Sequence, residues 1–155
     1  MLKMSRRMLV LAGLAVTAGR SLQAQDLPVI RVSKDASCSC CESWVEYLRA
    51  EGFPVEVTVL ELDALQAFKS EVGLPAEAWS CHTGQVDGYV LEGHVPAADI
   101  RRLLSERPDA IGLAVPGMPW GSPGMGPESE REAYAVLLVG KDGSTSQFSA
   151  YPAAT

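Results

Sequence analysis

The stretch Val29–Leu48, VIRVSKDASCSCCESWVEYL, predicts a strand, a turn and a helix in succession. Its apolar start is typical of a short buried strand, and the polar residues 33–39 predict the turn. Ser39 and Glu42 have the spacing of a capping box, so we expect the helix to begin at Ser39. Apolar residues then recur at the spacing of one helical face, at Cys41, Trp44, Val45 and Leu48. Three of the four cysteines in the chain therefore lie where a strand turns into a helix.

The chain continues with elements of both kinds. Residues 53–60 alternate apolar and polar side chains, as in a half-buried strand, with the apolar positions at Val55, Val57 and Val59. Apolar residues at helical spacing then predict a helix, at Leu62, Leu65, Phe68 and Val72. The later elements are expected to be a hairpin over 79–95 that turns at Asp87-Gly88, a helix over 97–106, a Gly- and Pro-rich loop over 109–131 and a hairpin over 133–151. This order, β-α-β-α-ββ-α with the loop and a C-terminal hairpin, predicts an α/β (α+β) protein with a modified thioredoxin-like fold.

The first 24 residues differ in charge from the remainder. Basic residues precede an apolar run over 8–18 and a short segment that ends at Ala24, which is the order of a secretory signal peptide. The pair Arg6-Arg7 also resembles a twin-arginine signal. We therefore expect residues 1–24 to be a signal peptide and residues 25–155 to be one periplasmic domain without a membrane span.

The charge of that domain excludes one class of partner. The 155-residue chain has a formal net charge of −6, but four of its 13 basic residues and none of its 19 acidic residues lie in residues 1–24. Residues 25–155 thus carry a formal charge of −10. Nucleic acid requires a basic surface, so it is not an expected partner.

All four cysteines lie in the predicted exported part, at Cys38, Cys40, Cys41 and Cys81. Two structural disulfides are the first alternative for an exported protein. However, adjacent cysteines place their Cα atoms about 3.8 Å apart, below the usual disulfide range. Cys38 and Cys41 also form a C-x-x-C pair at a helix N-terminus, where a lowered thiol pKa would suit disulfide exchange. A third neighbouring thiol would divert that exchange into wrong bridges, whereas a site for several soft metal ions gains a bridging sulfur.

The other soft ligands gather in two further stretches. Met118 and Met125 both lie in Pro-Gly-Met triplets of the predicted loop, where there is little core to fill. Thioether and thiolate together favour Cu(I) over hard ions. His82 and His94 lie in the hairpin that also carries Cys81. Cys81 and His82 would point to opposite faces of a regular strand, so one ion could use both only if the backbone bends there.

We therefore predict a copper site whose candidate ligands are Cys38, Cys40, Cys41, Cys81, His82, His94, Met118 and Met125. Zinc is the alternative metal, because sites with three or four cysteines are common for zinc. Zinc sites pair their ligands as two C-x₂₋₄-C clusters, and this chain has one such cluster.

Four motifs resemble the periplasmic CopG-like copper-resistance proteins and together span nearly all of residues 25–155. The motifs are Cys38-x-Cys40-Cys41-x-x-Trp44, SCHT at 80–83, GYVLEGHVP at 88–96 and GLAVPGMPWGSPGM at 112–125. The resemblance implies a modified thioredoxin-like fold, a multinuclear copper cluster bridged by the four cysteines, and a redox role in copper tolerance. His94 and the two loop methionines match family positions, and Ser39 stands where Gly is frequent.

These observations leave three functional hypotheses. The first is an exported protein that holds Cu(I) and interconverts Cu(I) and Cu(II), with a periplasmic redox partner. The second is a thiol–disulfide oxidoreductase that uses Cys38 and Cys41. The third is a passive metallochaperone that delivers copper to a membrane exporter.

Overall fold

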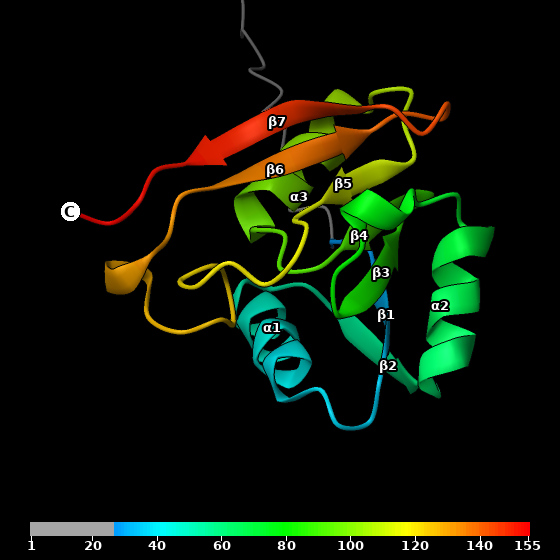
Figure 1. Ribbon diagram of the computed structural model, residues 1–155, viewed down its shortest axis with the longest axis horizontal. Coiled ribbons are helices and arrows are strands. Elements are labelled where there is room, and N and C mark those ends of the chain that lie inside the picture. The colour runs from blue at the N-terminus through cyan, green and yellow to red at the C-terminus, as the bar shows by residue number, and fades with distance from the viewer. Residues whose placement is uncertain (1–26) are drawn as a thin grey trace, which may run out of the picture.

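The computed structural model describes residues 27–155, which form a mixed sheet of seven strands in the order β2-β1-β3-β4-β5-β6-β7 (Figure 1). The predicted signal peptide, residues 1–24, lies outside the described residues. The elements are β1 (Ile30–Lys34), α1 (Ser39–Ala50), β2 (Val55–Val59), α2 (Leu62–Glu71), the short helix η1 (Ala76–Ala78), β3 (His82–Val86), β4 (Tyr89–Glu92), α3 (Ala97–Glu106), β5 (Gly112–Ala114), the short helix η2 (Glu128–Glu130), β6 (Tyr134–Val139) and β7 (Thr145–Tyr151). The predicted α+β class is confirmed, while the comparison with thioredoxin stays a prediction.

The first half of the sheet follows from the predicted order of elements. β1 and β2 pair in parallel across α1, whereas β3 pairs antiparallel with both β1 and β4. The predicted β3–β4 turn is confirmed, because Asp87 and Gly88 both have positive φ, of 46° and 87°. Such angles are those of a two-residue hairpin turn that matches the twist of its strands.

The expectation of a loop over the whole of 109–131 was wrong at β5. Gly112–Ala114 is a buried strand that pairs parallel with β4 and antiparallel with β6, and it therefore joins the two halves of the sheet. A Cβ on Gly112 would lie 1.8 Å from the carbonyl oxygen of Val90, so only glycine allows the two backbones this close. Three residues flanked by Gly and Pro give too short an apolar run to be recognised as a strand.

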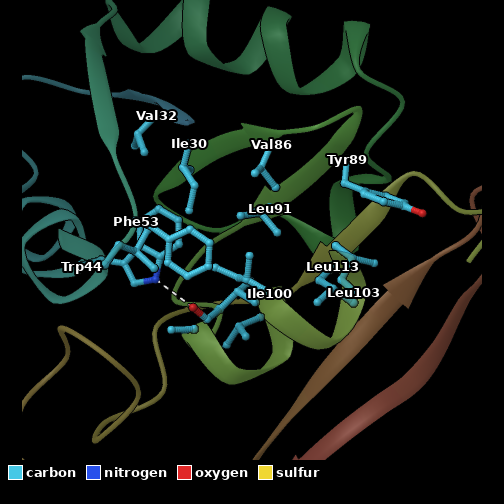
Figure 2. Packing of buried hydrophobic residues seen from close by; sticks show 14 of the residues in the cluster. Ile30, Val32, Trp44, Phe53, Val86, Tyr89, Leu91, Ile100, Leu103 and Leu113 are labelled. Carbon is cyan, nitrogen blue, oxygen red and sulfur yellow. Dashed lines mark hydrogen bonds between the residues drawn. The ribbon is translucent and has the colours of Figure 1, made fainter. Parts of the chain in front are cut away.

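The main core lies between the sheet and the pair α1 and α3 (Figure 2). The predicted apolar face of α1 is confirmed, since Cys41, Trp44, Val45 and Leu48 are all buried. The Trp44 indole N–H donates to the carbonyl oxygen of Val95 at 3.0 Å, which fixes α1 against the segment that enters α3. α2 faces the opposite side of the sheet, where Lys69 contacts Thr83 of β3.

Two further expectations about burial were wrong. Val57 and Val59 are 37% and 56% exposed, because β2 is the edge strand of the sheet. In α2, Leu65 is buried as expected but Leu62 is 56% exposed, and Lys69 takes an inward position instead. A charged residue occupies that position because a buried carboxylate faces it, as described below.

The start of α1 is as predicted, but its cap is not. The helix begins at Ser39 with Cys38 as its N-cap residue, and no side chain caps it. Glu42 forms an ion pair with the buried Lys34 at 2.8 Å instead of reaching back to the helix N-terminus. The first turn of α1 is thereby tied to the end of β1.

Among residues 27–155, no helix combines the length and the apolar character needed to cross a membrane.

Candidate metal centre

The turn between β1 and α1 gathers three sulfur atoms at one end of the sheet. Cys38 and Cys41 are joined by a disulfide, with their Cα atoms 5.4 Å apart. Cys40 is a free thiol whose Sγ lies 3.5 Å from Cys38 Sγ. The turn itself is held by Asp35, which accepts hydrogen bonds from the backbone N–H and the hydroxyl of Ser37.

The fourth cysteine reaches this cluster from the other half of the fold. Cys81 lies in a bend immediately before β3, and its Sγ is 3.8 Å from Cys40 Sγ across 41 residues of sequence. The four cysteine sulfurs all lie within 4.8 Å of one another. The sequence spacing predicted the first three as a cluster, and the pairing of β1 with β3 adds the fourth.

Cys81 also belongs to a second donor group with both histidines. Its Sγ lies 3.2 Å from Nδ1 of His82 and 3.4 Å from Nε2 of His94. The backbone bend at Cys81 is what brings neighbouring side chains to the same place, which a regular strand would forbid. One sulfur atom is therefore shared by an all-sulfur group and by a group with one sulfur and two nitrogen donors.

Both imidazoles are held in the neutral form. Burial, and then the proximity of His94, lowers the pKa of His82 well below its ordinary value. Burial also lowers the pKa of His94. A neutral imidazole offers a lone pair to a metal ion, whereas a protonated one does not.

The hydrogen bonds of the two rings show which nitrogens are available. His94 Nδ1 donates to the carbonyl oxygen of Pro123 at 2.7 Å, so the lone pair of its Nε2 points to Cys81. His82 Nε2 is buried and has no hydrogen-bond partner among the described residues. The His82 nitrogen that faces Cys81 is instead Nδ1, so the donor group consists of Cys81 Sγ, His82 Nδ1 and His94 Nε2, and thiolate and imidazole are ligands that suit copper and zinc. The donor set thus fits a soft metal ion.

The Cys81 thiol is not charged without a metal. Burial, and then the nearby Cys40, raises the pKa of the Cys81 thiol to about 12. Binding of a metal as a thiolate therefore has to displace a proton from Cys81. Cys38 and Cys41 have to be reduced first, with two electrons and two protons.

The two loop methionines differ in their positions. Met118 Sδ lies 4.0 Å from Cys40 Sγ, and the residue is 54% exposed at the mouth of the cluster. Met125 makes no sulfur contact with a cysteine among residues 27–155, and its backbone closes a tight turn with Gly121 and Ser122. The structure therefore brings Met118, but not Met125, to the cysteines.

The Gly- and Pro-rich loop lies alongside α1 (Figure 1) and meets it at Ser43 and Trp44. Gly124 has a φ of +82°, and a Cβ there would lie 2.6 Å from the backbone nitrogen of Trp44. Ser80 donates to the carbonyl oxygen of Gly117, which ties the other end of the loop to the residue before Cys81. The loop thereby connects His94 and Met118 to both halves of the site.

A groove of about 440 Å³ beside α2 gives solvent a route to the sulfurs. Cys38 and Cys81 lie on its wall, together with Trp79 and Lys69. Lys69 and its partner Glu92 were not predicted from the sequence. The one available signal was a charged residue in the apolar strand YVLE, which periodicity alone does not interpret.

The comparisons with known proteins agree with this site. A family model described as "Protein of unknown function, DUF411" matches residues 78–125. The chain is similar to two solved structures titled copper resistance protein CopG. Form 2 is 47% identical, with a TM-score of 0.74, and the match covers 81% of this chain and 99% of that chain. Form 1 is 48% identical, with a TM-score of 0.75, and the match covers 81% and 98%.

No curated protein matches the chain. The identity and coverage of the two structures are nevertheless sufficient to place it, and the predicted resemblance is confirmed: the chain belongs to the CopG copper-resistance protein family.

Proposed function

We propose that this protein binds Cu(I) in the periplasm through its cysteine cluster and so contributes to copper tolerance. The observation that carries the proposal is the pair of donor groups that share Cys81, one with four sulfurs and one with a sulfur and two neutral imidazoles. Family membership supports copper as the ion, since both similar structures are titled copper resistance proteins.

The chemistry of the donors favours Cu(I). Thiolate and thioether are soft ligands that select Cu(I), and imidazole also suits copper. The exposed Met118 sulfur beside Cys40 adds a thioether to the set, whereas protein zinc sites use thiolate, imidazole and carboxylate ligands. A shared thiolate at Cys81 allows the two groups to hold more than one ion, so we propose a multinuclear site.

A redox role is a further part of the proposal. The same donor set contains nitrogen ligands, which suit Cu(II) as well as Cu(I). The disulfide between Cys38 and Cys41 takes up two electrons and two protons when it is reduced to two of the site's own thiols. Interconversion of Cu(I) and Cu(II), with a periplasmic redox partner, follows as the proposed activity, and transfer to a membrane exporter would use the same ligands.

The decisive experiment is an anaerobic titration of fully reduced protein with Cu(I) against a chromophoric Cu(I) chelator. We expect more than one Cu(I) per chain, and a loss of most of this binding in a Cys38/Cys40/Cys41→Ser triple variant. Ser39→Ala is the matched control, since Ser39 is an exposed residue between Cys38 and Cys40 in the sequence. Equal weak binding by wild type and triple variant, or a preference for Zn(II), would overturn the proposal.

The Cys38–Cys41 disulfide also favours a second candidate, a thiol–disulfide oxidoreductase. The position of Cys40 argues against it, since a free thiol 3.5 Å from Cys38 can capture the reactive sulfur. The two candidates differ in the metal-free protein. Disulfide reduction with turnover by metal-free protein, retained in Cys40→Ser, would support the oxidoreductase, whereas the copper proposal expects no turnover.

A further inference from the structure

Glu92 carries a buried carboxylate directly beneath the Cys81–His82–His94 group. Its side chain is fully buried, and its Oε1 accepts from the Lys69 ammonium at 2.5 Å and from the backbone N–H of Ser80 at 2.5 Å. Its other oxygen accepts from the Thr83 hydroxyl at 2.7 Å, and Lys69 also donates to Thr83 at 2.9 Å. Both carboxylate oxygens are thus engaged by groups from three different segments.

Two of the residues that bind Glu92 flank candidate ligands in the sequence. Ser80 directly precedes Cys81, and Thr83 directly follows His82. Glu92 itself stands two residues before His94, with Gly93 between them. A Cβ on Gly93 would lie 2.5 Å from the carbonyl oxygen of Val115, so this connection has no room to shift. One carboxylate therefore holds both backbone segments that carry the Cys81–His82–His94 group.

Successive side chains of β3 point to opposite faces of the sheet, so the candidate ligand His82 and the Glu92 partner Thr83 lie on different sides. His82 points to the side of α1, where its ring centroid lies 4.3 Å from that of Trp44. Thr83 points to the opposite side, where Lys69 of α2 meets Glu92. The carboxylate therefore holds the strand from behind without occupying the space of a metal ligand.

Stability alone does not account for this arrangement. A buried ion pair costs desolvation of both charges, and apolar residues of similar volume commonly serve stability as well or better. What a charged group adds is short, directional hydrogen bonds, which fix the backbone in one position. Residues that hold ligands from behind typically change metal affinity by about 10- to 100-fold when they are replaced.

We propose that Glu92, held by Lys69 and Thr83, is a positioning residue that fixes the Cys81–His82–His94 group for metal binding. This inference rests on the proposed copper function and deepens it. Glu92 does not contact the metal in this proposal. It acts through the backbone at Ser80 and through the β3–β4 pairing.

The test compares Cu(I) affinity, by competition with a chelator, in wild type, Glu92→Gln and Thr83→Val. We expect Cu(I) affinity to fall by about 10- to 100-fold in Glu92→Gln, and to fall less in Thr83→Val, which loses one hydroxyl. X-ray absorption of the copper-loaded variants should show fewer nitrogen ligands per copper, since His82 and His94 are the nitrogen donors of the group that loses its position.

Asp99→Asn is the matched control for a general loss of stability. Asp99 is another buried carboxylate that accepts two hydroxyl hydrogen bonds, from Ser149 and Tyr151, but it ties α3 to β7 and contacts none of the candidate ligands. The Asp99→Asn variant should be less stable than wild type but bind Cu(I) with unchanged affinity.

A double variant separates positioning from stability. Lys69→Met with Glu92→Leu removes both charges, and we expect it to recover most of the stability lost in Glu92→Gln. If the double variant also regained wild-type Cu(I) affinity, or if Glu92→Gln bound like wild type, the inference would be overturned. A wild-type protein that did not bind Cu(I) would instead refute the proposed function, and the inference with it.

Discussion

Substitution of Gly124 by alanine should damage the site through the loop, without touching any candidate ligand. Gly124 has a φ of +82°, a conformation that costs an L-residue about 1–2 kcal/mol. The added Cβ would also lie 2.6 Å from the backbone nitrogen of Trp44 and 2.9 Å from its Cα. These are backbone atoms of a helix, which cannot rotate away, so overpacking should add about 1–3 kcal/mol.

Gly143 offers the control for the conformational part of this cost. Its φ is +79°, nearly the same as that of Gly124, but a Cβ there would meet nothing within 4 Å. Gly143→Ala should therefore lower the free energy of unfolding by about 1–2 kcal/mol, and Gly124→Ala by about 2–5 kcal/mol. Chemical denaturation of the metal-free variants measures both values.

The functional part of the prediction follows from the neighbouring residue. Pro123 accepts the hydrogen bond from His94 Nδ1 that leaves His94 Nε2 free toward Cys81. A loop displaced from α1 would break that bond, so Cu(I) affinity should fall in Gly124→Ala and stay unchanged in Gly143→Ala. The reasoning would be refuted if the two variants were equally stable, or if both bound Cu(I) like wild type.

Two further predictions concern charged groups near the site. Glu42→Gln should lower the free energy of unfolding by about 1 kcal/mol more than Lys34→Met does, as measured by chemical denaturation. The first variant leaves a buried ammonium without its carboxylate partner, whereas the second removes that ammonium. The opposite order of stabilities would contradict the ion pair. The metal-free protein should lose stability as the pH falls from 7 to 5. Burial holds the pKa of His82 and His94 below the ordinary value, so the unfolded chain takes up protons that the folded chain does not. The loss should be at most about 1.4 kcal/mol per pH unit for each histidine, and denaturation curves that are flat or more stable at pH 5 would contradict it.

The local elements could be predicted because their signals are contained in short windows. The face of α1 needs only the spacing of Cys41, Trp44, Val45 and Leu48, and all four are buried. The hairpin turn needs only Asp87-Gly88, a pair that tolerates positive φ. The prediction of buried residues failed in β2 and α2, because burial depends on which other segments cover an element. An edge strand has the same alternation of apolar and polar residues as an inner strand.

The candidate site was predictable in its chemistry and less so in its geometry. The residue types and the C-x-C-C spacing favoured a soft metal over two structural disulfides. The four cysteine sulfurs do lie together, although one bridge, Cys38–Cys41, forms among them. The prediction of a capping box failed because Glu42 pairs with Lys34 instead. No local pattern in the sequence indicates that Lys34 is buried. Met118 and Met125 stand in identical triplets, yet they differ in position because the loop folds back between them.

The buried charges show why the ligands alone do not define this site. A strand exposes alternate residues to opposite faces, so each ligand on β3 has a neighbour that faces away from the cluster. His82 faces Trp44, and Thr83 next to it faces Lys69 and Glu92. Hydrophobic periodicity predicts an apolar residue at a buried position such as Glu92. A carboxylate stands there because it accepts hydrogen bonds from an N–H, a hydroxyl and an ammonium at once. Glu92 is the one charged residue among the four buried residues of β4, and a packing argument from the sequence does not explain it.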